Sequence, residues 1–223
     1  MSNIEKIREN YNRNYSQKRD RWSIHDLKNA NKIIGYILKK TSINNQDNIP
    51  YALDVGCAKG HITEALRLHG FKAYGIDYSD VAISIAKQNF PSCTFYHMDG
   101  FNPNFKEKFD LILVRGFSGT NTHNIDFIAD FSKKYINLLK KDGIYIIGFR
   151  TNFSGTEKGK EMANLTFNEI NKLNQKLNYK LINLYYFPSS KIIELKNLIL
   201  YPFNLMKITN KKYKYFVYLI FSN

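Results

Sequence analysis

The chain carries an acidic residue and a run of small residues at the end of its first strongly apolar stretch. Asp54 lies near the end of that stretch, and the turn Gly56-Cys57-Ala58-Lys59-Gly60 follows it. Small residues at these positions let the backbone approach a ligand closely. About twenty residues later a second apolar run ends in another acid, Asp77. This layout of strand, glycine turn, helix, strand and acid is typical of a nucleoside-binding βαβ unit.

The spacing of the small residues and the charge of Asp54 indicate which nucleoside cofactor is bound. A dinucleotide fingerprint requires a third small residue at the position that His61 occupies here. A carboxylate at Asp54 would repel a pyrophosphate, whereas it suits a cofactor that has a cationic centre and an amino group. S-adenosylmethionine (SAM) has a sulfonium and an α-ammonium, and its one carboxylate can accept hydrogen bonds from amides at the helix start. The turn therefore favours SAM over a dinucleotide.

Apolar periodicity predicts that strands and helices alternate after Pro50. The strands are expected at about 51–55, 73–77, 93–98, 109–114 and 144–149, and near 179–187 and 213–221. The helices are expected at about 60–69, 80–89, 124–140 and 157–177. Repeated βα units imply a mostly parallel sheet, and a final strand that loops back is antiparallel to its neighbour. We therefore predict an α/β fold with a doubly wound, mostly parallel seven-stranded sheet, an antiparallel last strand and helices on both faces.

The chain divides into two expected parts. Residues 1–45 are polar with a helical pattern, and their aromatic side chains, among them Tyr11, Tyr15 and Trp22, suit a helical lid that folds over SAM. A plain surface helix is an equal alternative. Residues 46–223 form the predicted SAM-binding domain. An apolar insert at about 189–210 is expected to wall the substrate pocket or to form a dimer contact, so the protein is expected to be a monomer or a homodimer.

Composition restricts the classes of partner. The 223 residues suffice for one buried domain, and the two cysteines form no disulfide or metal pattern. No apolar run approaches the ~18 residues of a membrane helix. We therefore expect a cytoplasmic protein with no membrane span and no metal. The net charge of +14 allows a nucleic-acid partner, but attraction of a small anionic substrate explains it as well, and so do solvated lysines.

Five short motifs occur in an order that resembles one known family. They are residues 53–60, 75–79, 98–100, 109–114 and 138–145. In this order and spacing the chain resembles the class I (Rossmann-like) SAM-dependent methyltransferases over about residues 50–150. The resemblance implies an enzyme that takes a methyl group from SAM and releases S-adenosyl-L-homocysteine.

The resemblance also implies roles for the residues at which the motifs match. Asp77 would accept hydrogen bonds from both ribose hydroxyls, Tyr78 would pack on the adenine, and Asp99 would accept one from the adenine amino group. The residues expected to bind the cofactor are Asp54, Gly56, Cys57, Ala58, Gly60, Asp77, Tyr78, Ser79, Asp99, Gly100 and Arg115. The alternative for Asp77 or Asp99 taken alone is an acid that caps a turn.

The methyl acceptor is expected near the residues that follow the fourth and fifth strands, because substrates of open α/β sheets lie over the carboxyl ends of the strands. Arg115 and Arg150 suit a carboxylate or a phosphate, unless each pairs with a neighbouring acid. His123 is the candidate base, with a surface or capping histidine as the alternative. These three residues form the expected catalytic set.

The residues after the fourth strand also argue against one branch of the family. The segment Arg115-Gly116-Phe117-Ser118 departs from the Asn/Asp-Pro-Pro-Tyr/Phe signature of methyltransferases that act on nitrogens of nucleic-acid bases or glutamine. We therefore expect O-methylation of a small anionic metabolite or of a sugar- or phosphate-type glycan precursor. An RNA methyltransferase and a catalytically inactive partner subunit of the same fold are the alternatives.

Overall fold

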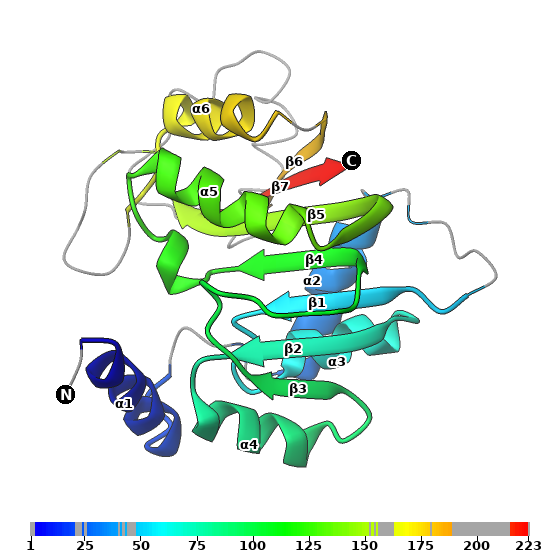
Figure 1. Ribbon diagram of the computed structural model, residues 1–223, viewed down its shortest axis with the longest axis vertical. Coiled ribbons are helices and arrows are strands. Elements are labelled where there is room, and N and C mark those ends of the chain that lie inside the picture. The colour runs from blue at the N-terminus through cyan, green and yellow to red at the C-terminus, as the bar shows by residue number, and fades with distance from the viewer. Residues whose placement is uncertain are drawn as a thin grey trace.

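The computed structural model describes residues 3–20, 24, 26–39, 41, 43, 48–151, 153, 155, 163–178, 180–188 and 215–222. Within them the chain forms a seven-stranded sheet with the strand order β3-β2-β1-β4-β5-β7-β6 (Figure 1). Five of the strands run parallel to one another, and these are β1 (Tyr51–Val55), β2 (Lys72–Asp77), β3 (Thr94–His97), β4 (Phe109–Arg115) and β5 (Leu139–Thr151). Their carboxyl ends therefore lie at one edge of the sheet, which we call the carboxyl edge.

The last two strands complete the sheet in the opposite sense. They are β6 (Lys180–Pro188) and β7 (Tyr215–Ser222). β7 lies between β5 and β6 and runs antiparallel to both. The predicted seven-stranded, mostly parallel sheet with an antiparallel last strand is confirmed.

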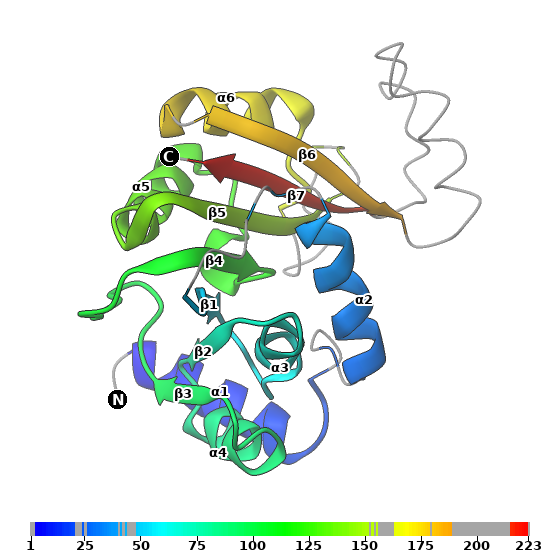
Figure 2. The same cartoon turned by 90° about the vertical axis from the view of Figure 1, so that its right-hand side faces the viewer.

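Helices cover both faces of the sheet, as Figure 2 shows. One face carries α2 (Leu27–Leu38) and α3 (His61–Leu68), and the other carries α5 (Ile125–Ile136) and α6 (Phe167–Leu177). The remaining helices are α4 (Asp80–Asn89), which packs beside β3, and α1 (Asn3–Ser16), which lies beyond the carboxyl ends of β2 and β3 (Figure 1). A short 3-10 helix, η1 (Ser118–Thr120), follows β4.

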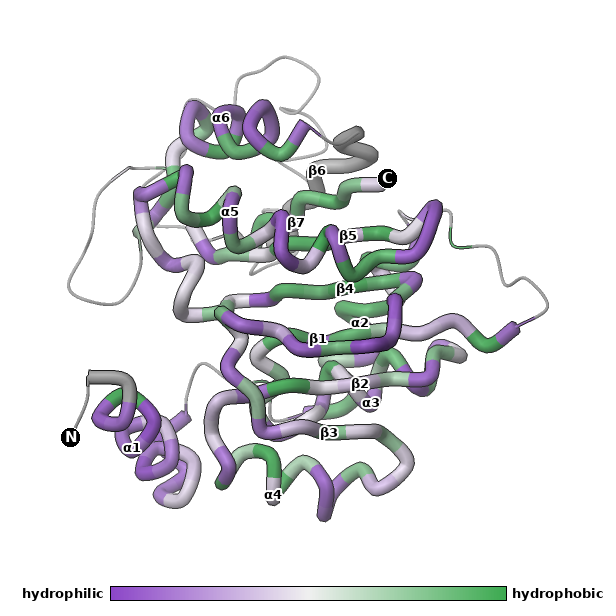
Figure 3. The backbone as a smooth tube through the Cα atoms, in the orientation of Figure 1, coloured by the Kyte–Doolittle hydropathy of each residue, from purple (hydrophilic) through white to green (hydrophobic). Residues whose placement is uncertain are grey.

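Alternating side chains along the strands build two apolar layers. On β4, Ile112 and Val114 face α5 and α6, while Leu111 and Leu113 face α2 and α3, and all four are buried. Figure 3 shows the central strands as largely hydrophobic and α1 as largely hydrophilic. The apolar core therefore consists of the sheet and the helices on its two faces, and α1 is attached mainly through polar contacts.

The helix expected at 157–177 begins later than predicted, at Phe167. Thr166 caps it, because its hydroxyl oxygen accepts a hydrogen bond from the Glu169 N–H while the Glu169 carboxylate accepts one from the Thr166 N–H. Reciprocal bonds of this kind satisfy two donors at a helix start and fix its first residue.

The helix expected at 124–140 ends earlier than predicted, at Ile136. The fifth strand, expected at about 144–149, begins earlier, at Leu139, and Asp142 within it has a φ of +64°. Trp22 and the insert at 189–210 lie outside the described residues, so their roles stay predictions. In the described part of the chain, no helix is long and apolar enough to cross a membrane.

Gly75 in β2 lies in a closely packed layer, and we expect Gly75→Ala to destabilise the protein. An added Cβ would lie 2.8 Å from the Phe95 ring and 2.9 Å from the Cys57 sulfur. Overpacking of this kind lowers the free energy of unfolding by roughly 1–3 kcal/mol, which urea denaturation measures. Gly35→Ala in α2 is the control, because its Cβ would come no closer than 3.5 Å to the His69 ring and alanine favours a helix by up to about 1 kcal/mol. Equal losses in both variants would contradict this packing account.

Candidate functional site

The strand order reverses between β1 and β4, and open α/β sheets bind ligands beyond the carboxyl ends of their strands at such a point. Asp54 is the penultimate residue of β1, and Arg115 is the last residue of β4. Asp54 pairs in register with Leu113, so Asp54 and Arg115 extend from the same face of neighbouring strands. Residues predicted to bind the cofactor and the acceptor therefore meet at the carboxyl edge.

The turn after β1 needs left-handed backbone at three positions. The φ angle is +75° at Gly56, +49° at Ala58 and +84° at Gly60. Gly60 also has no room for a side chain, because an added Cβ would lie 2.7 Å from the Phe95 ring. The Cys57 side chain is buried in the cluster that contains Phe95, and burial raises the pKa of its thiol. The turn can therefore offer its backbone to a ligand, while the Cys57 side chain serves packing.

Asp77, at the end of β2, holds this turn in place. Its Oδ2 accepts a hydrogen bond from the Ala58 N–H at 2.9 Å, and its Oδ1 accepts one from the Ser79 N–H at 2.9 Å. Burial raises the pKa of Asp77, and these hydrogen bonds oppose that shift. Each carboxylate oxygen can accept a second hydrogen bond, so Asp77 keeps capacity for a ligand hydroxyl. The Ser79 side chain caps α4 by accepting a hydrogen bond from the Ala82 N–H.

Asp54 is a carboxyl group buried within the sheet, with only 2% of its surface exposed. The Thr63 hydroxyl donates to its Oδ2 at 2.7 Å. Burial raises the pKa of Asp54 to about 7, and the Thr63 hydrogen bond and the charge of Arg115 offset this only in part. A cation beside such a group stabilises its ionised form. The sulfonium and ammonium of SAM are cations of this kind, so the site fits the predicted cofactor.

Arg115 is fixed by two aromatic side chains of β7. Its Nε donates to the Tyr218 hydroxyl at 2.8 Å, and its guanidinium carbon lies 4.1 Å from the centre of the Phe216 ring. Tyr218 lies across Gly148 of β5, where an added Cβ would lie 2.7 Å from the Tyr218 ring. The guanidinium has further N–H donors for a ligand. In the part of the chain that the structure describes, no acid forms an ion pair with Arg115.

Arg150 extends from the same face of the sheet, one strand further along. The register of β5 and β7 pairs it with Phe216. The Arg115 guanidinium lies over the ring of the same Phe216. Arg150 is exposed, and none of the described acids forms an ion pair with it. The alternative in which each arginine pairs with a neighbouring acid is therefore not found among the described residues.

The third predicted motif forms a tight turn after β3. The Asp99 Oδ1 accepts a hydrogen bond from the Phe101 N–H at 2.9 Å, and its Oδ2 accepts one from the Asn102 side chain at 2.8 Å. Asp99 thus caps a turn, as the alternative interpretation expects, although its oxygens can each accept a further hydrogen bond. The Gly100 carbonyl accepts a hydrogen bond from the Tyr135 hydroxyl at 2.6 Å, which ties this turn to α5.

Phe117 packs against the turns at the carboxyl edge. In the sequence, only its position after β4 indicates that it lies at this edge. A Cβ added to Gly56, Gly100 or Gly119 would lie 3.2, 2.9 or 2.6 Å from the Phe117 ring. The ring also stacks on Phe131 of α5, with 5.1 Å between centroids. The three glycines therefore make room for one aromatic ring that fixes the turns relative to one another.

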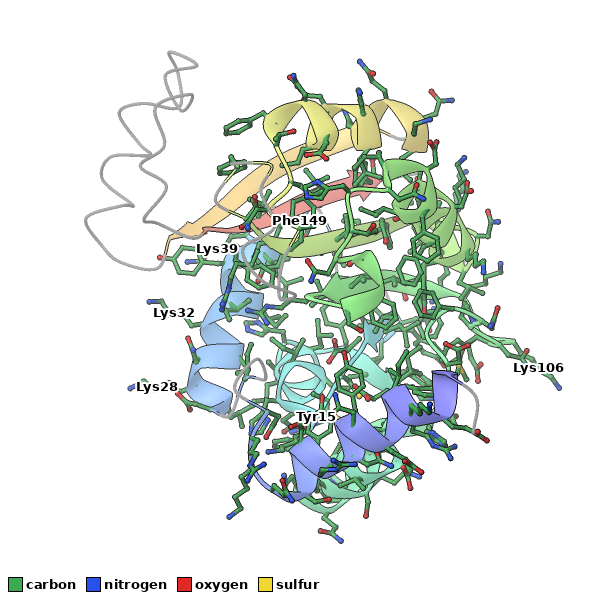
Figure 4. The ribbon with its side chains drawn as sticks, turned by 90° about the vertical axis from the view of Figure 1, so that its left-hand side faces the viewer. Tyr15, Lys28, Lys32, Lys39, Lys106 and Phe149 are labelled. Carbon is green, nitrogen blue, oxygen red and sulfur yellow. The ribbon has the colours of Figure 1, made fainter. Side chains whose placement is uncertain are left out.

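The N-terminal segment contacts the turns after β1 and β2. The Ser79 hydroxyl donates to the Asn12 Oδ1 at 2.6 Å. Lys59 forms a 2.9 Å ion pair with the buried Asp20, and its ammonium lies 5.9 Å from the centre of the Tyr15 ring. Figure 4 shows Tyr15 on α1, where its side chain is buried. The segment expected to form a lid therefore touches two of the three turns at which the cofactor is expected.

His123 lies between η1 and α5, and its Nδ1 is 2.6 Å from the Glu169 Oε1 of α6. Glu169 has no signal of this role in the sequence, because the pattern of Thr166 followed three residues later by Glu169 indicates a helix cap and nothing more. His123 lies on the side of the sheet that α5 and α6 cover. Asp54 and Arg115 extend from the opposite face, so the candidate base approaches the carboxyl edge from the other side.

Comparisons with known proteins agree with this geometry. Residues 47–212 match the family model described as a methyltransferase domain. A SAM-dependent methyltransferase from Clostridium acetobutylicum has 16% identity and a TM-score of 0.62 over 99% of both chains. The N-methyltransferase NodS from Bradyrhizobium japonicum, in complex with S-adenosyl-L-homocysteine, has 15% identity and a TM-score of 0.64 over 96% of this chain and 98% of its own.

A SAM-dependent methyltransferase from Geobacter sulfurreducens, also in complex with S-adenosyl-L-homocysteine, has 15% identity and a TM-score of 0.61 over 93% of this chain and 95% of its own. At these identities the solved structures show a shared fold. No curated protein matches the chain.

The buried carboxyl group of Asp54 leads to a prediction about stability and pH. The folded protein holds the Asp54 proton more tightly than the unfolded chain does, so this residue's contribution to the free energy of unfolding falls as the pH rises from about 4 to about 7. Asp54→Asn stays neutral and can still accept from Thr63. We expect it to lack this fall and to exceed the wild type above pH 7 by up to about 4 kcal/mol.

Urea denaturation of both proteins across this pH range measures the difference. Asp130→Asn, at an exposed position of α5, is the control and should follow the wild-type curve. Parallel curves for Asp54→Asn and the wild type would show that the buried carboxyl group does not titrate as described.

Proposed function

Because this chain belongs to the methyltransferase-domain family and is a SAM-dependent methyltransferase, we propose that it methylates an oxygen atom of a small anionic molecule. SAM is the methyl donor and S-adenosyl-L-homocysteine is the product. The observation that carries the proposal for the acceptor is the position of Arg115. Its guanidinium is held at the carboxyl edge by aromatic contacts and has no acidic partner among the described residues.

The acceptor is proposed to carry a carboxylate or a phosphate that Arg115 and Arg150 bind. Guanidinium groups bind such anions through two parallel hydrogen bonds, which fix orientation as well as position. Methyl transfer is an in-line displacement, and aligning the two reactants can supply much of the reduction of its barrier. An arginine that is itself immobilised by Tyr218 and Phe216 suits that task, because little freedom is left to lose on binding.

The cofactor is proposed to lie across the turns after β1, β2 and β3. Asp54 would face the cationic methionine part of SAM, Asp77 the ribose hydroxyls, and Asp99 the adenine amino group. Each acid comes from the end of a different parallel strand and retains hydrogen-bonding capacity. Tyr78 is proposed to pack on the adenine, and the left-handed turn at Gly56 and its neighbours to present its backbone to the methionine part.

Of residues 1–45, we propose that only the part up to Asp20 acts as a lid over the bound cofactor, because α2 belongs to the apolar core. The support is that this part of the chain contacts the turns after β1 and β2: Asn12 of α1 contacts Ser79, and Asp20, which follows α1, pairs with Lys59. A segment held by these few polar contacts can open at lower cost than one held by a large apolar surface. Closure over the site would also exclude water from the reacting atoms.

An RNA acceptor is the second candidate, because the net charge is +14. In Figure 4 the labelled lysines lie on different sides of the molecule: Lys28 and Lys32 project from α2, Lys39 directly follows that helix, and Lys106 lies at the opposite side. Positive charge that is spread in this way is less suited to a nucleic-acid backbone than a continuous stripe would be. This distribution favours the small acceptor.

We expect the wild-type protein to release S-adenosyl-L-homocysteine from SAM when it is given the anionic fraction of a small-metabolite extract separated by anion exchange. Arg115→Ala and Arg150→Ala should each lower kcat/KM for that fraction about tenfold or more, because a hydrogen bond to a charged group contributes roughly 1.5–3 kcal/mol. The affinity for SAM, measured by calorimetry, should be unchanged in Arg150→Ala, whereas Arg115 is also among the residues expected to bind the cofactor.

Arg67→Ala is the matched control, because its guanidinium pairs with Glu64 on α3 and should not affect transfer. Turnover of the neutral fraction alone would contradict the anionic acceptor. Turnover of RNA, with binding that weakens steeply as salt is added, would establish the second candidate instead. No turnover with any pool would favour the inactive partner subunit.

A further inference from the structure

The two carboxylate oxygens of Glu169 have different partners: one contacts Thr166 and the other contacts His123. Its Oε2 accepts hydrogen bonds from the N–H and the hydroxyl of Thr166, each at 2.7 Å. Its Oε1 lies 2.6 Å from the His123 Nδ1. Burial tends to raise the pKa of Glu169, but the hydrogen bonds from Thr166 and His123 outweigh burial and lower it. Glu169 is therefore an ionised, immobile partner for the imidazole.

The other ring nitrogen of His123 has a different environment. Nε2 is buried and has no hydrogen-bond partner among the residues that the structure describes. Buried polar atoms are nearly always paired, so an exception calls for a functional explanation. A carboxylate beside Nδ1 favours the tautomer that carries its proton on Nδ1, which leaves the lone pair on Nε2. Nε2 is therefore ready to accept a proton.

His123 and Glu169 lie at the same edge of the sheet as Arg115. His123 follows β4 after η1 and precedes Asn124, the N-cap of α5. The Thr151 hydroxyl, at the end of β5, donates to the Leu165 carbonyl at 2.7 Å, which places the start of α6 beside that strand end. The pair thus stands over β4 and β5 on the side of α5 and α6.

We propose that Glu169 is a positioning residue that holds His123 as the general base, and that the acceptor atom is a hydroxyl oxygen. This inference rests on the proposed function. A carboxylate or phosphate oxygen is already ionised and needs no base, whereas a hydroxyl must lose a proton. A histidine held in this way can act as a general base only if the acceptor has a proton to lose. The structure therefore favours a methyl ether as the product over a methyl ester.

The proposed step balances in atoms and charge. A lone pair of the hydroxyl oxygen forms the new bond to the methyl carbon, the carbon–sulfur bond breaks, and its electron pair stays on sulfur. The hydroxyl proton moves to Nε2 of His123, and Nδ1 donates to Glu169 throughout. One positive charge disappears from the donor and one appears on the imidazole, where the carboxylate stabilises it.

The other charged groups on the helices around His123 either form an ion pair with another residue or are exposed. Asp126 in the first turn of α5 forms an ion pair with Lys176 of α6. Lys172, three residues after Glu169 on α6, is exposed. Glu169 is therefore the acid that contacts His123 in the described part of the chain.

Nitrogen NMR of the full-length protein labelled with ¹⁵N-histidine tests the arrangement without any acceptor. The His123 signals are assigned by their loss in His123→Gln. We expect the neutral ring to carry its proton on Nδ1 in the wild type and to become a mixture of tautomers in Glu169→Ala. A proton on Nε2 in the wild type, or an unchanged tautomer in Glu169→Ala, would overturn the inference.

Kinetics with the anionic metabolite fraction provide the second measurement. His123→Gln should lower kcat about 10²–10⁴-fold and abolish the rise of rate with pH. Glu169→Gln should lower kcat about tenfold or more and move that rise to lower pH, because a neutral amide stabilises the imidazolium less than a carboxylate does. The KM for the acceptor should not change in Glu169→Gln.

Asp26→Ala is the control for the lost helix cap, since Asp26 caps α2 in a comparable way far from His123. A Glu169→Ala variant with the rate and pH profile of Asp26→Ala would show that Glu169 has only a structural role, and the inference would be wrong. If no fraction supports turnover by the wild type, the proposed function fails, and the tautomer measurement still decides whether Glu169 positions His123.

Discussion

A carboxyl group buried in the central strand is the constraint on which the rest of the site depends. Asp54 is desolvated, and it becomes ionised near neutral pH only because Thr63 and Arg115 partly offset the effect of burial. Arg115 in turn depends on Tyr218 and Phe216, which come from the last strand of the chain. The antiparallel end of the sheet therefore immobilises the arginine that lies beside the cofactor turn, in addition to completing the fold.

The two faces of the sheet have different proposed tasks at their common edge. The face covered by α2 and α3 supplies Asp54, Arg115 and Arg150, which are charged groups suited to the cofactor's cations and an anionic acceptor. The face covered by α5 and α6 supplies His123 with Glu169, which are suited to removing a proton. An acceptor placed between them would have its anionic end on the arginines and its hydroxyl near Nε2. This division explains why one small site draws on residues from both halves of the chain.

Local residues made the fold and the cofactor predictable from sequence. Gly56 and Gly60 occupy left-handed positions in a turn that only small residues form easily, and Asp77 ends the next strand. The spacing of these residues over a short stretch of sequence is therefore enough to predict the turn and its cofactor. The partners of the acceptor side are not predictable in this way. Tyr218 lies 103 residues from Arg115, and Glu169 lies 46 residues from His123. Their sequence context indicates a strand and a helix cap, and only tertiary packing shows what their remaining polar atoms contact.

Proton release on SAM binding shows whether Asp54 faces the cationic part of the methyl donor. A cation beside Asp54 lowers the pKa of this carboxyl group, so SAM should displace a proton from it near pH 6.5. Calorimetric titrations in buffers of different ionisation enthalpy measure the number of protons released. We expect the wild type to release a fraction of one proton and Asp54→Asn to release none, and the variant should also bind SAM more weakly. Equal proton release by both proteins, or full SAM affinity in the variant, would contradict this role of Asp54.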